Sequence, residues 1–106
     1  PGVLMIESAV QAARAVLDRR AELGMLPKEN RYVLGEVRAL KYGSFVRPGD
    51  TLRIETRLTG TDDATGRFDF RVSATITGSA PTAGDPPTAF SGRITLRPVQ
   101  TALTPA

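Results

Sequence analysis

The first 23 residues constrain the fold most, because they form one long, mostly apolar segment in a chain of only 106 residues. The segment is rich in Ala, Leu and Met and has no Gly or Pro between Val3 and Leu23. Pro1 suits a helix start, since the N–H that proline lacks would be unpaired there. Gly24 and Pro27, which follow, are typical helix stops. The sequence therefore predicts a helix from about Val3 to Leu23, with its first four turns apolar nearly all round and buried on most sides.

The polar residues that interrupt the apolar segment include four at spacings of 4, 3 and 4: Glu7, Gln11, Arg14 and Asp18. On a helix this spacing places them in one line along one face. Taken alone, such a line is the wet edge of a buried helix. Arg14 and Asp18 are interpreted as a solvated edge or an interface ion pair.

The remainder of the chain predicts about four strands, because apolar and polar residues alternate in segments bounded by Gly, Pro and Asp. Alternation gives each strand one wet and one dry face, which favours an antiparallel sheet. The predicted strands are Tyr32–Tyr42, Thr51–Leu58, Phe68–Ile76 and Ala89–Arg97.

The connections carry turn signals. Gly35 predicts a bulge or a close approach inside the first strand. Pro48-Gly49-Asp50 predicts a turn, residues 60–66 a hairpin turn, and residues 78–87 a long mobile loop.

One buried helix followed by about four strands predicts an α+β fold, with an antiparallel sheet wrapped round one long helix. A second subunit is the simplest cover for the remaining side of that helix. We expect one domain over residues 1–98 and a flexible tail over 99–106.

Composition excludes several classes of function. The chain has no Cys and no His, and no Gly-rich phosphate loop, so we expect no metal and no cofactor. The net charge is +3, but the arginines look scattered along the sequence, which argues against nucleic-acid binding. No apolar run reaches the roughly 18–20 residues of a membrane span, and we expect a cytoplasmic protein.

Two blocks of sequence resemble the bacterial β-hydroxyacyl-acyl-carrier-protein dehydratases. The opening Pro1-Gly2-Val3-Leu4-Met5-Ile6-Glu7-Ser8-Ala9-Val10-Gln11-Ala12 is similar to the family pattern P-G-V-L-x-x-E-x-x-x-Q-A of the central helix. Downstream, Leu34–Tyr42 and then Val46–Leu52 resemble the family's next strand and its P-G-D turn. The resemblance extends more weakly to about Arg97. It implies a hotdog fold that works as a dimer or a trimer of dimers, with active sites at the dimer interface.

The resemblance also implies an activity: dehydration of a β-hydroxyacyl thioester on acyl carrier protein to the trans-2-enoyl thioester, in fatty-acid or related synthesis. Glu7 matches the helix carboxylate that protonates the leaving hydroxyl, and Glu rather than Asp there favours the simple dehydratase. Gly2 matches a glycine whose N–H holds the thioester carbonyl; the alternative is simple helix-start geometry. Gln11 matches a family Gln and is expected to orient the carboxyl or a water.

Three further residues are assigned to substrate contact: Val3 beside Gly2, and Tyr42 and Phe45, which could line an acyl tunnel or belong to the ordinary core. Arg19 and Arg20 could dock the acidic carrier protein, or could serve only the helix C-terminus.

The chain departs from the family in one respect that matters for catalysis. The family's His, which removes the α-proton, lies in an H-F-P-G segment that would fall about seven residues before Pro1. We expect an N-terminal segment to be missing. Two alternatives stay open: a non-catalytic hotdog subunit that binds acyl chains or supports a partner, and a hotdog acyl thioesterase.

Overall fold

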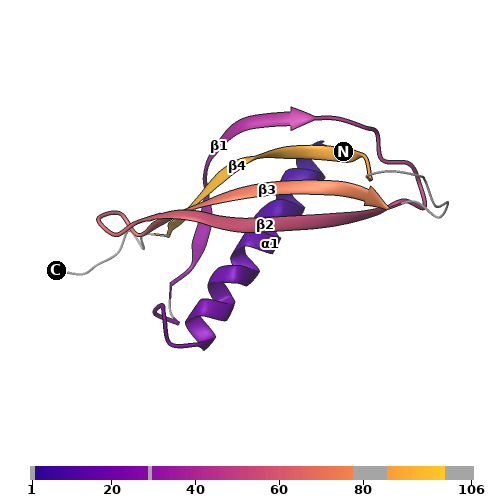
Figure 1. Ribbon diagram of the computed structural model, residues 1–106. Helices are drawn as coiled ribbons and strands as arrows, with labels where there is room; N and C mark the ends of the chain where they lie inside the picture. The colour runs from indigo at the N-terminus through magenta and orange to yellow at the C-terminus, as the bar shows by residue number, and fades with distance from the viewer. Residues whose placement is uncertain (1, 29, 78–85, 100–106) are drawn as a thin grey trace.

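The computed structural model describes residues 2–28, 30–77 and 86–99, and shows an α+β fold of one helix packed on one antiparallel sheet (Figure 1). The helix crosses one face of the curved sheet obliquely (Figure 1). The elements are α1 (Gly2–Glu22), β1 (Tyr32–Tyr42), β2 (Thr51–Asp62), β3 (Arg67–Thr77) and β4 (Thr88–Pro98).

The end of α1 is fixed by a Schellman motif. Met25 N–H donates to the Arg20 carbonyl at 2.9 Å, and Gly24 N–H donates to the Ala21 carbonyl at 3.0 Å. Gly24 has φ of +76°, a conformation in which a side chain is disfavoured. Arg19 and Arg20 lie in the last turn, where the negative end of the helix dipole stabilises positively charged side chains. The predicted helix is thus confirmed to within one residue at each end.

The sheet has the strand order β1-β4-β3-β2, and every neighbouring pair is antiparallel. Alternate residues of β3 face the helix and are buried, as the alternation predicts. They meet the buried side of α1 and β4 in one core. Its members are Ala9, Val10, Ala13, Leu17, Phe68, Phe70, Val72, Ala74, Ile76, Ala89, Phe90, Ile94 and Leu96.

The helix buries one face only. Ala9, Ala13 and Leu17 are almost wholly buried, whereas Ala15 is exposed and Val16 is half-buried. The expectation of burial on most sides is therefore wrong for the single chain, because the sheet covers one side of α1 and no other described element covers the opposite side. Over the described residues, no helix combines the length and apolar character needed to cross a membrane.

Strand β1 contains two irregularities. Its pairing with β4 shifts between Leu34 and Glu36, which confirms the bulge predicted at Gly35. It shifts again between Arg38 and Lys41, where Ala39 adopts a φ of +51°. The second irregularity was not predicted.

The turns differ in how well the sequence predicts them. At Pro48–Gly49, Asp50 N–H donates to the Arg47 carbonyl at 3.0 Å and Gly49 has φ of +90°, so the expected turn is confirmed. The hairpin turn is shorter than predicted, because β2 runs on to Asp62. Most of the predicted loop (78–87) and most of the predicted tail (99–106) lie outside the described residues.

Candidate functional site

The polar line of α1 lies on the face that the sheet leaves uncovered. Glu7, Gln11 and Asp18 are exposed, whereas Arg14 is half-buried. The Arg14 Nε–H donates to the Tyr32 carbonyl at 2.9 Å, which ties the helix to the start of β1. Arg14 is therefore not a freely solvated residue in the single chain, because it satisfies a backbone acceptor. An ion pair of Arg14 or Asp18 across an interface stays a prediction.

Glu7 and Gln11 are one helical turn apart, with Cβ atoms about 6 Å from each other. Neither side chain makes a hydrogen bond or ion pair with the described part of the chain. Glu7 is exposed. The burial expected of a carboxyl that acts as an acid is thus not supplied by the described residues. Two polar groups of complementary chemistry instead stand side by side on an open surface.

Gly2 and Val3 lie in the first turn of α1. That turn carries no acidic side chain, so no carboxylate of its own neutralises the positive end of the helix dipole. Free backbone N–H groups at such an end can hold a developing oxyanion.

Tyr42 and Phe45 do not belong to the core. The two residues are 55% and 91% exposed and lie at the end of β1 and just beyond it. The expectation that Tyr42 and Phe45 belong to the ordinary core is therefore wrong. A role in lining an acyl tunnel would require a covering surface outside the described residues.

The sheet face turned away from the helix carries a second feature, which the sequence analysis missed. Seven of the twelve arginines lie on this face, so the interpretation of the arginines as scattered is wrong. Each of them occupies a position that points away from the helix in a strand whose residues alternate between the two faces. The strand order and the register bring these positions together. They are Arg38, Arg53, Arg57, Arg67, Arg71, Arg93 and Arg97.

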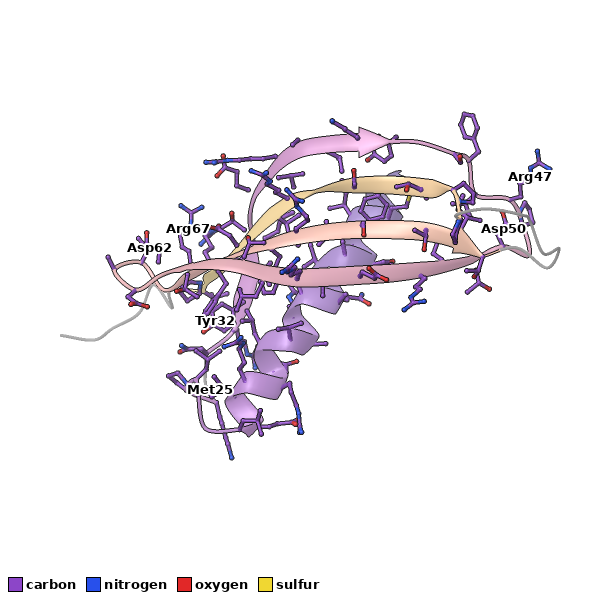
Figure 2. The ribbon with its side chains drawn as sticks, in the orientation of Figure 1. Met25, Tyr32, Arg47, Asp50, Asp62 and Arg67 are labelled. Carbon is purple, nitrogen blue, oxygen red and sulfur yellow. The ribbon has the colours of Figure 1, made fainter. Side chains whose placement is uncertain are left out.

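A groove of about 520 Å³ runs over this face. Five arginines line it together with Glu36, Asp62 and Asp69. Figure 2 shows Asp62 and Arg67 where β2 and β3 meet at the hairpin. In addition, the Nε of Arg67 is buried with no hydrogen-bond partner among the described residues.

Only part of the groove's charge is neutralised within the chain. Arg38 forms a two-point ion pair with Glu36, with Nε to Oε1 at 2.9 Å and Nη2 to Oε2 at 3.0 Å. The hydrogen bond from Arg38, aided by the nearby charges of Arg38 and Arg67, lowers the pKa of Glu36 below its ordinary value. Asp69 accepts a hydrogen bond from the Thr95 hydroxyl at 2.9 Å.

No described group of three or more His, Cys, Asp and Glu side chains is placed to hold a metal ion. No family model, no curated protein and no solved structure matches this chain.

Proposed function

We propose that this chain is the helix-and-sheet part of a hotdog-fold hydro-lyase that dehydrates β-hydroxyacyl groups carried by acyl carrier protein in the cytoplasm. One observation carries the proposal. Glu7 and Gln11, the two polar residues that the pattern P-G-V-L-x-x-E-x-x-x-Q specifies, lie one turn apart on the uncovered face of α1. A helix lying on a four-stranded antiparallel sheet is compatible with the hotdog architecture.

The residues suit the reaction. A base removes the α-proton of the thioester, and the electron pair forms the double bond as the C–O bond to the β-hydroxyl breaks. Glu7, in its protonated form, gives its proton to the leaving hydroxyl, which departs as water. N–H groups at the start of α1, Gly2 included, stabilise the enolate-like oxygen of the thioester. Gln11 holds the Glu7 carboxyl or the departing water in place.

The proposed site is completed by a second surface. The 106 residues contain no His, so the base is supplied from elsewhere in the natural protein or by a partner chain. A second subunit packed on the uncovered face of α1, in a dimer or a trimer of dimers, would remove Glu7 from water. Desolvation favours the neutral carboxyl, which is the form that an acid catalyst needs. The same subunit would cover Val3, Tyr42 and Phe45, the proposed contacts of the acyl chain.

The test is hydration of a crotonyl or longer enoyl thioester by the natural protein that contains these residues, followed by loss of enoyl absorbance. Glu7→Gln keeps the shape of the side chain and removes its acid, so we expect kcat/KM to fall by about 10²–10⁴-fold. Asp18→Asn is the matched control, because Asp18 is exposed on the same line of α1. We expect its activity to stay within about twofold of wild type.

Two results would count against the proposal: equal losses in both variants, or a folded, oligomeric wild type without hydratase activity. The second result would favour a non-catalytic subunit that binds acyl chains. Binding of a fluorescent fatty acyl probe to the wild type would then be the decisive measurement.

A further inference from the structure

The register of the sheet places four arginines in one straight row across all four strands. Arg38 of β1 is opposite Arg93 of β4, Arg93 is opposite Arg71 of β3, and Arg71 is opposite Arg57 of β2. All four side chains are exposed on the face away from α1. Because neighbouring strands lie about 4.8 Å apart, this arginine row spans about 14 Å.

The row holds more positive charge than the chain neutralises. Glu36 pairs with Arg38. The guanidinium groups of Arg57, Arg71 and Arg93 make no hydrogen bond or ion pair within the part of the chain that the structure describes. Like charges directly opposite one another destabilise a sheet. The row contains three such arginine–arginine pairs. An anionic ligand that bridges the row would relieve their repulsion.

A second row lies beside the first and carries the opposite charge. Glu36, Thr95 and Asp69 are cross-strand neighbours, two residues along each strand from Arg38, Arg93 and Arg71. The two rows are therefore roughly 7 Å apart on the same face. A ligand that covers the groove meets a line of cations and, next to it, a line with two carboxylates.

These rows favour a protein over a nucleic acid. A phosphate backbone would meet Glu36 and Asp69 with repulsion, and single strands need aromatic stacking platforms. The aromatic residue of the groove lining, Phe70, is fully buried. A helix, in contrast, presents side chains in lines with an axial repeat of about 5.4 Å per turn, close to the spacing of the arginines. It can carry carboxylates on one line and Lys, Arg or amides on the next.

We propose that the groove binds an acidic α-helix of a partner protein, laid across the strands with carboxylates at positions i, i+4, i+7 and i+11 over the arginine row. The guanidinium groups of Arg57, Arg71 and Arg93 can each receive a carboxylate through two N–H donors. Arg38 already gives Nε and Nη2 to Glu36, and its remaining N–H donors on Nη1 and Nη2 face the fourth carboxylate. The proposal does not rest on the dehydratase function, because Glu7 lies on the helix that packs against the other face of the sheet.

The test measures binding by fluorescence anisotropy, with a labelled helical peptide that has glutamates at those four positions and lysines on the adjacent line. A second peptide of the same composition has its glutamates distributed round the helix. We expect the first peptide to bind at least tenfold more tightly, and Arg71→Ser/Arg93→Ser to lower its affinity at least tenfold. The control, Arg31→Ser/Arg47→Ser, removes the same charge at two exposed residues away from the row and should change affinity less than twofold.

Circular dichroism of both double variants should match wild type, since all four side chains are exposed. Equal binding of the two peptides, or equal losses in the two double variants, would show attraction to net charge and overturn the proposal. So would a DNA duplex or polyphosphate that binds more tightly than the first peptide and loses affinity only in Arg71→Ser/Arg93→Ser.

Discussion

At the scale of single residues, Thr56 carries a hydroxyl group into the apolar side of the sheet. It follows Ile54 on the helix-facing side of β2 and is paired with Val72 of β3. Its Oγ1 is buried and has no hydrogen-bond partner among the described residues. A buried hydroxyl without a partner costs about 1–3 kcal/mol relative to its state in water.

Thr56→Val replaces this hydroxyl with a methyl group of similar shape. We expect the free energy of unfolding to rise by about 1 kcal/mol, because the unpaired oxygen is removed and apolar area is added. Urea unfolding measures the change. Thr61→Val, at an exposed position of the same strand, should change stability by less than about 0.5 kcal/mol. A loss of stability in Thr56→Val would mean that Oγ1 has a partner in solution.

At the scale of elements, the end of a helix or strand can be predicted from the sequence where the following turn requires a particular residue. Gly24 ends α1 because the two hydrogen bonds of the Schellman motif require its left-handed backbone. A Cβ added there would meet no atom within 4 Å, so the only penalty of a side chain is that of the backbone.

Gly24→Ala is accordingly expected to destabilise the chain by about 1–2 kcal/mol. Thermal unfolding followed by circular dichroism at 222 nm measures this effect. Gly60→Ala is the control, since its Cβ would meet only Asp69 Oδ2, at an ordinary 3.5 Å, and its φ is not positive. If both variants lose the same stability, the special role of Gly24 is disproved.

The same elements show how far sequence reasoning reaches. The alternation of Phe68, Phe70 and Val72 with charged residues predicts β3 and its buried face correctly. The alternation of apolar and polar residues predicts β2 only as far as Leu58, because Thr59–Asp62 contains no large apolar residue. These four residues continue the strand through their pairing with β3. Local pattern cannot predict a strand that is stabilised mainly by hydrogen bonds to its neighbour.

At the scale of the whole molecule, the arginine row could not be predicted because it depends on strand order. Arg38 and Arg93 are 55 residues apart in the sequence, and the pairing of β1 with β4 makes them neighbours. The helix line of Glu7 and Gln11, in contrast, depends only on helical spacing, and the structure places both on one exposed face.

Arg71→Thr removes a central charge of the row and introduces a residue that favours strands. We expect the free energy of unfolding to rise by about 0.2–1 kcal/mol at low salt, and the gain to shrink at about 0.5 M NaCl, where repulsion is screened. Arg53→Thr serves as the comparison, because Arg53 lies 3.4 Å from Glu55 in an ion pair. A greater gain from Arg53→Thr than from Arg71→Thr would contradict repulsion within the row.

The two irregularities of β1 have a consequence for how copies of this chain can assemble. Strands β1 and β2 are the two borders of the sheet, and between Thr51 and Leu58 the pairing of β2 with β3 is uninterrupted. Bulges make a border a poor template for another strand, whereas a regular border accepts one. Two copies joined through β2 about a twofold axis would each use the one regular border of the sheet that the described residues form. Growth of a continuous sheet would therefore terminate at two copies, and polymerisation through the sheet borders would be blocked.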